Sequence, residues 1–416
     1  MTKVLLVTLY FPPAGGGGVQ RPLKFATHLP ALGIETHVLA PDNPRWVHMD
    51  PDLRPPTQAW VHRIRYLGPR GRLPSEELHG KTGLDRVVTH ARLFPRRLIV
   101  PDEAATWNLT AIPAALRIAR TEKIDVVITT SPPGSVHLVG AAVKRAHGTR
   151  WIADLRDSLL AHQDRRADTT AARVKARTVR AVGQIVARRA DAIVTAFDSI
   201  AEEMRGLSPE GRVVTIPNGS DFDDFEGLPY TPGDRFRITH TGAFFGQRDP
   251  KPFLRALAES GLDDVVARFV GGFRAADREF AESLGLGDRV EVIPFVPRRR
   301  SLELQRDSDA LLLIASPAGG RGTGVIPGKV FEYVAAERAI LAAVPVDGAA
   351  ASLIDEIGAG IVASPDDADA LRAALVELHG RWKRGDVRVE LSSEARGRVD
   401  RLARVRELAT LVHELS

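Results

Sequence analysis

The chain of 416 residues contains no cysteine, few lysines and no long apolar run. Without cysteine it has no disulfide, no thiolate nucleophile and no cysteine-ligated metal. No stretch approaches the roughly 18 to 20 apolar residues that a membrane-spanning helix needs. The apolar run at residues 3–9 leads directly into a glycine loop, so we interpret it as a first β-strand rather than a signal peptide. These absences favour a cytoplasmic protein.

The common nucleotide and metal fingerprints are missing as well. Three residues after Gly17, the dinucleotide motif G-x-G-x-x-G would need a glycine, and the chain has Gln20. The Gly-Lys pair in "GVIPGKV" is followed by Val330, where a P-loop needs Ser or Thr. The acidic string "DFDD" at 221–224 lies in a region that we interpret as a linker, and we expect its carboxylates to be solvated. Neither a nicotinamide cofactor nor a bound metal is therefore expected.

Positive charge is concentrated in two stretches. The net charge is +5, yet residues 51–100 hold ten basic and four acidic residues, and residues 165–190 hold eight basic residues and one acid. One interpretation is a pair of solvated helix faces. The other is an anionic partner, either a phosphorylated or lipid-linked substrate or an anionic membrane surface. Nucleic acid is disfavoured because these stretches lack interleaved aromatic residues and match no nucleic-acid module.

Apolar strand-like runs alternate with helical patterns in both halves of the chain, which predicts βαβ units on parallel sheets. We expect strands at 3–9, 35–41, 61–67, 125–131, 150–156, 191–196 and 212–218, and again at 235–242, 267–272, 290–296, 309–316, 338–345 and 360–365. The predicted domains are an N-terminal Rossmann-like domain at 1–220, a linker at 221–235, a C-terminal domain at 236–390, and a C-terminal helix at 391–416 that packs back on the first domain. Two doubly wound α/β domains in tandem predict a ligand cleft beyond the carboxyl ends of the strands.

Glycine-rich loops follow strands in both predicted domains. Loops of this kind admit a phosphate or another polar ligand to backbone N–H groups, and residues 15–18 are all glycine. In the second half, Arg248 and Lys329 could supply the countercharge to a phosphate, and Glu332 is suited to accept hydrogen bonds from ribose hydroxyls. The chain has 9 Lys against 48 Arg, so a lysine in a glycine-flanked loop suggests a need for a compact ammonium group.

Four segments in order, "TIPNGSD", "HTGAFFGQRDP", "FVP" and "IPGKVFEYVAAERAILA", resemble family 4 glycosyltransferases of the GT-B fold, in particular the branch that assembles polysaccharides and glycoconjugates. The resemblance covers nearly the whole chain. It implies retaining transfer of a sugar from a nucleoside-diphosphate sugar, with a UDP-sugar favoured, to a hydroxyl acceptor, and it implies that no divalent metal is required.

The resemblance also assigns roles to single residues. It assigns the donor diphosphate to Arg248 and Lys329, with Gly16 and Gly17 bordering it, and the nucleoside to Glu332, Phe295 and Val296. We place Arg156 and Gly18 on the acceptor side. Asp157 and Asp154 are our candidates for the base or for orienting the acceptor, and His137 is a further catalytic candidate. Two positions depart from the family pattern. Gly324 stands where many relatives carry a glutamate that contacts the sugar, and Arg156–Asp157 stand where many carry a histidine. The sugar and the proton acceptor therefore stay open.

Two other functions remain alternatives. A nucleotide-sugar epimerase on the same fold would need paired acid and base residues around the sugar, and no convincing pair is found. A degenerate GT-B protein would bind a nucleotide sugar or a partner without transfer, and Gly324 keeps this hypothesis open. The basic stretches lead us to expect a phosphorylated or lipid-linked acceptor, with peripheral contact at the inner face of a membrane.

Overall fold

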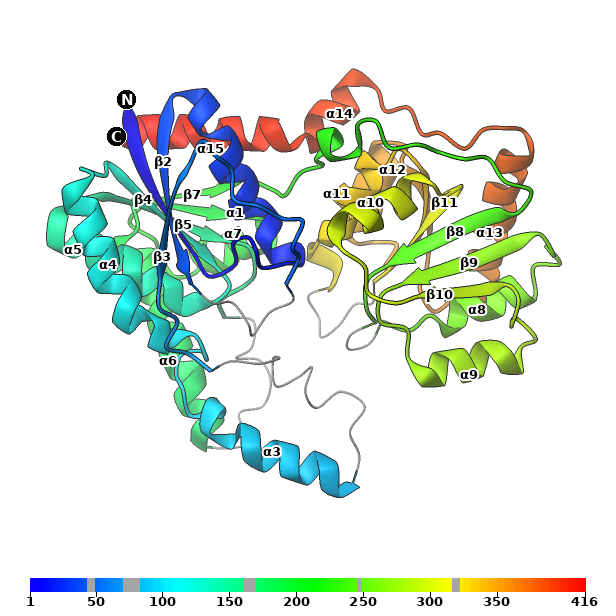
Figure 1. The fold of residues 1–416 in the computed structure, drawn as a ribbon, viewed down its shortest axis with the longest axis horizontal. Helices are drawn as coiled ribbons and strands as arrows, with labels where there is room; N and C mark the ends of the chain where they lie inside the picture. The colour runs from blue at the N-terminus through cyan, green and yellow to red at the C-terminus, as the bar shows by residue number, and fades with distance from the viewer. Residues whose placement is uncertain (43–48, 70–82, 161–169, 245–247, 316–321) are drawn as a thin grey trace. The chain divides into compact units, whose positions relative to one another are not determined.

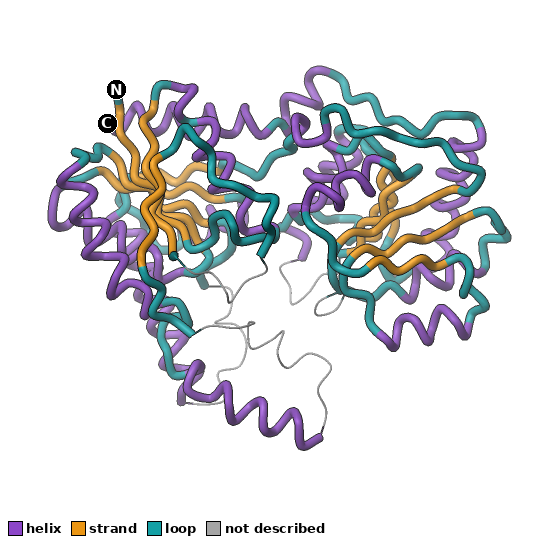
Figure 2. Tube along the Cα trace, viewed as in Figure 1, coloured by secondary structure: helices purple, strands orange, loops and turns teal. Residues whose placement is uncertain are grey.

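The computed structural model describes residues 1–42, 49–69, 83–160, 170–244, 248–315 and 322–416. The chain divides into two compact units, each built around one parallel sheet with helices on its faces (Figures 1 and 2). Unit 1 comprises Met1–Pro217 and Arg404–Ser416, and unit 2 comprises Asn218–Ala403. The predicted α/β class with two doubly wound sheets is confirmed.

Unit 1 has a seven-stranded sheet in the order β3-β2-β1-β4-β5-β6-β7. Its strands are β1 (Thr2–Thr8), β2 (Ile34–Pro41), β3 (Trp60–Ile64), β4 (Val126–Ser131), β5 (Arg150–Leu155), β6 (Ala192–Thr195) and β7 (Arg212–Thr215). All neighbours are parallel, and Val4 of β1 lies opposite Thr36 of β2 and Val126 of β4. Each strand overlaps a run predicted from the sequence, with β1, β2 and β3 beginning one residue earlier than predicted. Buried parallel strands can be predicted in this way because they read as continuous apolar segments.

Helices cover both faces of this sheet. The described helices of unit 1 are α1 (Gly17–His28), α3 (Gly83–Arg97), α4 (Asn108–Thr121), α5 (His137–His147), α6 (Thr170–Arg189), α7 (Asp198–Arg205) and most of α15 (Arg401–Leu415). Val4 and Leu6 alternate along β1 and therefore share a face, where they pack with Phe25 of α1 and with Val405 and Leu408 of α15. The C-terminal helix thus completes the core that the N-terminal strand begins.

Unit 2 has a six-stranded parallel sheet in the order β10-β9-β8-β11-β12-β13. The strands are β8 (Phe236–Thr241), β9 (Val265–Val270), β10 (Val290–Ile293), β11 (Ala310–Ile314), β12 (Ala339–Ala343) and β13 (Gly360–Ala363). The described helices are α8 (Lys251–Ala258), α9 (Ala275–Ser283), α10 (Arg298–Arg306), α11 (Gly328–Ala335), α12 (Ala349–Glu356), α13 (Ala368–Lys383) and α14 (Ser393–Val399). The restart of the alternating pattern near residue 235 had predicted this second sheet.

Each face of the second sheet has its own apolar core. Leu312 of β11 packs in the cluster that includes α8 and α13, whereas Leu311 and Leu313 pack in the cluster of α11 and α12. Successive side chains of a strand point to opposite faces, so one strand supplies both cores. The helices of unit 2 are thereby held on both sides of the sheet, and α11, which carries Lys329 and Glu332, is fixed by its buried Val330 and Val334.

The segment predicted to be a solvated linker packs against unit 2. Its short 3₁₀ helix η4 (Phe222–Phe225) buries Phe222 and Phe225 in the core cluster of α11. Asp224 forms an ion pair with Arg298 at 2.8 Å, and Asp221 lies 3.4 Å from Arg401. The expectation of solvated carboxylates in "DFDD" is therefore wrong for these two residues, because both face arginines of unit 2.

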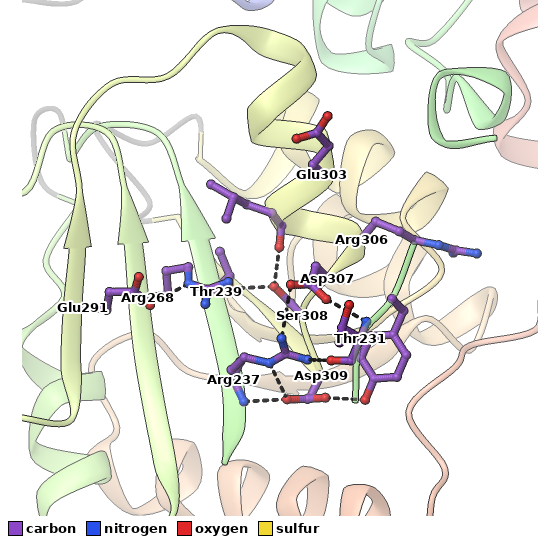
Figure 3. Close-up of polar contacts among 12 residues, drawn as sticks. Thr231, Arg237, Thr239, Arg268, Glu291, Glu303, Arg306, Asp307, Ser308 and Asp309 are labelled. Carbon is purple, nitrogen blue, oxygen red and sulfur yellow. Dashed lines mark hydrogen bonds and ion pairs between the residues drawn. The ribbon is translucent and has the colours of Figure 1, made fainter. Parts of the chain in front are cut away.

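A second ion network fastens the next part of this segment to the amino end of the sheet (Figure 3). Arg237 of β8 pairs with Asp307 and Asp309 at 3.2 and 3.3 Å and donates to the carbonyl of Thr231 at 2.6 Å. The Tyr230 hydroxyl donates to Asp309 at 2.6 Å. The charged groups at this amino edge are thus paired with one another within the protein.

Candidate functional site

The topology of each sheet singles out one place for a ligand. Strand order reverses between β1 and β4 in unit 1 and between β8 and β11 in unit 2. In open α/β sheets, ligands bind beyond the carboxyl ends of the strands at such switch points, where successive connections leave in opposite directions. The glycine loop that follows Thr8 begins at the first of these points, and the loop that follows Thr241, which opens with Gly242, begins at the second.

In unit 1 the glycine loop ends at the start of α1. Gly16 is the N-terminal cap of α1 with φ 91°, a left-handed conformation that favours glycine. A Cβ on Gly17 would meet no protein atom within 4 Å, and a Cβ on Gly18 would make only ordinary contacts with Tyr10 and Arg156. Local geometry thus accounts for Gly16. The space beside Gly17 agrees with the predicted approach of a ligand, which stays a prediction.

Arg156, predicted on the acceptor side, lies just after β5 and is 7% exposed. Its guanidinium donates to the carbonyls of Ser131 at 2.7 Å, of Pro132 at 3.4 Å and of Gly18. These carbonyls belong to the last residue of β4, the residue that follows it, and the first turn of α1. Arg156 therefore connects the ends of β4 and β5 to the start of α1, and its donors already bind backbone oxygens.

Asp154, predicted as a candidate base, has no exposed surface. Arg21 of α1 donates to its carboxylate through Nε at 3.1 Å and through Nη2 at 2.8 Å, and the Thr130 hydroxyl donates at 2.7 Å. Arg21 is itself only 2% exposed. Enclosure and ion pairing are typical of a structural pair, and the predicted role of Asp154 as proton acceptor stays a prediction.

The other two catalytic candidates differ in exposure. His137 is fully buried, its Nδ1 lies 2.8 Å from the Thr129 hydroxyl, and burial lowers its pKa to about 3. A buried histidine with a lowered pKa is typical of a core residue, and the catalytic role of His137 stays a prediction. Asp157 is exposed at the carboxyl end of β5. It is the one predicted carboxylate of unit 1 that a substrate can reach.

In unit 2, Lys329 reaches from the first turn of α11 to the end of β8. Its Nζ donates to the Thr241 hydroxyl at 3.3 Å. Gly242 makes room for it, since a Cβ there would lie 2.6 Å from the lysine Cε, and the φ of 122° favours glycine as well. Burial lowers the pKa of Lys329, which Glu332 opposes and Arg248 and Arg298 reinforce. The ammonium group is thus held at the switch point with one long protein hydrogen bond among the described residues.

Arg248, the second predicted phosphate ligand, lies near the same group. Burial lowers the pKa of its guanidinium, and its charge helps to lower the pKa values of Lys329 and His240. Within the described part of the chain it forms no hydrogen bond or ion pair with another side chain. The positive charges of Arg248 and Lys329 thus act on each other, and each has few protein partners among the described residues, an arrangement that favours an anion such as a diphosphate.

Glu332, predicted to bind ribose, is half-buried one turn into α11. Arg298 donates to its Oε1, and Gln305 donates to its Oε2 at 3.1 Å. Burial raises the pKa of this carboxyl, but Arg298 and Lys329 outweigh that effect and the net pKa is lowered. The carboxylate is therefore ionised and oriented before any ligand binds. The sequence did not indicate Arg298 or Gln305, because the spacing of an "RRR" run does not show which arginine points inward.

The remaining predicted contacts lie in the loop after β10. Phe295 is 61% exposed and Val296 is half-buried. Gly324, which departs from the family pattern, lies after β11 in a 3₁₀ turn (Gly322–Gly324). Among the residues that the structure describes, no group of three or more His, Asp or Glu side chains is arranged to hold a metal ion.

Comparison with solved structures defines the class of the fold. Over 100% of this chain and 99% of the other, it is similar to sucrose-phosphate synthase from Thermosynechococcus elongatus, with a TM-score of 0.61 and 17% identity. The Anabaena protein HepE in complex with UDP-glucose matches over 100% of both chains, with a TM-score of 0.61 and 13% identity. A candidate UDP-N-acetylglucosamine 2-epimerase of Listeria monocytogenes matches over 99% and 96%, with a TM-score of 0.51 and 13% identity. The two Rossmann-like units are those of a GT-B fold.

The family is indicated by the N-terminal unit. Residues 16–219 match the model of a glycosyl transferase 4-like domain. A search of curated proteins finds no match. The resemblance to family 4 glycosyltransferases stated from the sequence is confirmed, and the match begins inside the glycine loop and ends just after Pro217.

Proposed function

We propose that this protein transfers a sugar from a nucleoside-diphosphate sugar, with a UDP-sugar favoured, to a hydroxyl acceptor, and that the anomeric configuration is retained. The observation that carries the proposal is the cation Lys329 at the end of β8, whose charge interacts with that of Arg248. Both have few protein partners among the described residues, and the ionised Glu332 lies one turn from Lys329 on α11. A diphosphate with an attached ribose has the complementary charges and hydroxyls.

The proposed reaction needs stabilisation of a leaving diphosphate. The bond between the anomeric carbon and the diphosphate oxygen breaks, and the acceptor oxygen forms a new bond to the same carbon on the same face. Negative charge that develops on the departing oxygen is offset by Lys329 and Arg248, which are positioned in advance. The acceptor proton passes to that departing oxygen or to Asp157, the exposed carboxylate after β5. The two cations perform the role that a divalent metal would have, so we expect transfer to persist in the presence of a chelator.

Calorimetric binding of UDP, GDP and dTDP tests the donor site. We expect the wild type to bind UDP most tightly, and we expect Lys329→Ala to weaken this binding by about 10- to 150-fold, the effect of one hydrogen bond to a charged group. Lys383→Ala, in the exposed half of α13, is the matched control and should bind as the wild type does. Absence of binding by all three nucleotides at millimolar concentration would contradict the proposal.

The alternatives are separated by product analysis. A transferase consumes the donor only when an acceptor is present, whereas an epimerase changes the sugar without one. A degenerate binding protein binds the nucleotide sugar but neither transfers the sugar nor changes it. In the transferase, Asp157→Asn is expected to lower kcat by about 10²- to 10⁴-fold if this carboxylate is the base, with donor affinity unchanged. If the affinity for the donor fell by the same factor as kcat, the result would contradict a role for Asp157 as the base.

We further propose that the acceptor is presented at an anionic membrane surface and that helix α3 contacts this surface. Three apolar side chains of α3, spaced as one helical face, are open to solvent: Leu84 is 83%, Val87 63% and Val88 64% exposed. The helix carries four arginines against one aspartate in its sequence, a net charge of +3. An apolar face on a basic helix is the pattern of an interfacial helix. No described helix is long and apolar enough to span a bilayer.

Sedimentation with vesicles of anionic or zwitterionic lipid tests this contact. Wild type is expected to sediment with anionic vesicles, and Val87→Asp with Val88→Asp to remain in solution. Leu109→Asp, at a 70% exposed apolar position of α4, is the matched control and should sediment as the wild type does. Of the basic residues in the two stretches, Arg96 is paired with Glu103 at 2.7 Å, while Arg165, Arg166 and the side chain of Arg97 lie outside the described residues. Equal sedimentation of wild type and the α3 variant would contradict the contact.

A further inference from the structure

Arg298 at the start of α10 differs from the two arginines that follow it. Arg298 is 16% exposed, whereas Arg299 and Arg300 are 73% and 58% exposed and pair only with Glu303 among the described residues. The guanidinium of Arg298 lies between two carboxylates. Its Nη2 is 2.8 Å from Asp224 of η4, and its Nη1 donates to Glu332 of α11. Only this arginine of the run is directed toward the candidate donor site.

The geometry fixes both oxygens of Glu332. Oε1 accepts from Arg298, and Oε2 accepts from Gln305, whose side chain is fully buried and also lies 3.2 Å from Ser301. Each carboxylate oxygen has two lone pairs, and the described residues supply one donor to each oxygen, which leaves one lone pair on each for a further donor. Two such lone pairs on a carboxylate of fixed orientation match the two adjacent hydroxyls of a ribose.

We propose that Arg298 is a positioning residue through which the site distinguishes a ribonucleotide from a 2′-deoxyribonucleotide. This inference rests on the proposed function, since it needs a nucleotide at Glu332. Arg298 acts through the carboxylate and does not itself contact the ribose. A hydrogen-bond acceptor that is held in place loses more when the hydroxyl is absent, because its orientation cannot change to find another donor.

Asp224 extends the same arrangement to the segment that follows unit 1 in the chain. It binds the second nitrogen of Arg298, and burial of Phe222 and Phe225 on either side fixes its backbone. Burial lowers the pKa of Arg298, but Glu332 and Asp224 outweigh burial and the pKa is raised, so the guanidinium stays charged. The string "DFDD", which we expected to be solvated, thus supports the candidate nucleoside site.

Calorimetry with UDP and 2′-deoxy-UDP tests the inference on the full chain. Wild type is expected to prefer UDP by about tenfold or more, the effect of a hydrogen bond to a charged group. In Arg298→Ala this preference should fall toward one. Arg298→Lys should keep part of it, since a lysine keeps the charge but not the fork of two nitrogens. Arg299→Ala is the matched control and should keep the whole preference.

The outcomes separate this inference from the function that it rests on. If wild type binds neither nucleotide, the donor site itself is wrong and the inference falls with it. If wild type binds UDP but Arg298→Ala keeps the same preference over 2′-deoxy-UDP, the function stands and the role of Arg298 is refuted. Equal wild-type affinity for both nucleotides also refutes it. Should Arg298→Ala fail to fold, Asp224→Asn, which leaves the arginine in place, is expected to reduce the preference, and an unchanged preference in that variant would refute the inference.

Discussion

The carboxyl ends of the two sheets both carry charged side chains, but the partners of those charges differ. In unit 1, Asp154 and Arg21 are buried against each other, and Arg156 donates to three backbone carbonyls. In unit 2, Lys329 has one contact of 3.3 Å and Arg248 has no ion pair within the described residues. Charges paired inside the protein stabilise loops, whereas charges held near one another without partners favour an anion. The described charges at the carboxyl end of the first sheet thus support the fold of unit 1, whereas those of unit 2 are available to a ligand.

The largest expected effect comes from removing the buried carboxylate of unit 1, which tests whether its paired charges stabilise the fold. Asp154→Ala leaves Arg21 charged and enclosed, and we expect the free energy of unfolding to fall by about 3 to 5 kcal/mol. Asp157→Ala, three residues further and exposed, is the matched control and should change it by less than about 0.5 kcal/mol. Urea unfolding measures both. Equal unfolding of the two variants would show that the Arg21–Asp154 pair does not support the fold.

Removal of a cation from unit 2 should lower ligand affinity and leave the stability of the fold unchanged. We expect Arg248→Ala to weaken UDP binding by about 1.5 to 3 kcal/mol, the effect of a hydrogen bond to a charged group, without loss of stability, because the guanidinium has no carboxylate partner in the described residues. Calorimetry and urea unfolding of the same preparation check both parts. Arg255→Ala on α8 serves as the control for an arginine away from the site. A drop in stability with unchanged affinity would assign Arg248 to the fold instead.

Acid pH should affect the two units alike, through one buried histidine in each. Burial lowers the pKa values of His137 and His240 to about 3. An unfolded histidine binds a proton below about pH 6.5, and the folded one does not until about pH 3, so stability falls as the pH falls through this window. The expected slope is about 1.4 kcal/mol per pH unit for each histidine. Above pH 6.5 neither contributes a slope.

Variants of these histidines are expected to give the smallest change. His137→Asn and His240→Asn should each reduce the dependence of the unfolding free energy on pH, measured by urea unfolding, by about 1.4 kcal/mol per pH unit between pH 3 and pH 6.5. His147→Asn, at an exposed position at the end of α5, is the control and should leave the dependence as in the wild type. If the acid dependence is the same in all three variants, the loss of stability originates in other groups.

The strands could be predicted from the sequence because burial on both faces of a sheet requires continuous apolar residues. Short runs such as "KVLLVTL" and "DALLLIAS" are typical of such buried strands. The order of strands in each sheet could not be predicted from such runs. Lys329 could be singled out because lysine is rare in this chain and stands beside glycine. Its neighbour in space, Gly242, is recognisable for a different reason, because it is a glycine that directly follows a predicted strand.

The partners of the site residues were not predictable, since they depend on side-chain direction. Asp154 and Asp157 are three positions apart in "ADLRDS", yet one is enclosed by Arg21, which is 133 positions away, and the other is exposed. Within "RRR", only the packing of α10 against α11 and η4 shows that Arg298 points inward. Period and composition assign residues to elements, but ion pairs between distant elements follow only from the fold.

The core of unit 1 contains residues from both sides of unit 2 in the sequence, which affects the order in which it can form during synthesis. Strands β1 to β7 leave the ribosome before unit 2 does, but the core beside β1 also contains Val405, Leu408 and Val412 of α15. All of unit 2 is synthesised before these residues appear. The nascent first domain must therefore keep an uncovered apolar face while the second domain is translated, and its final packing is a late event in biosynthesis.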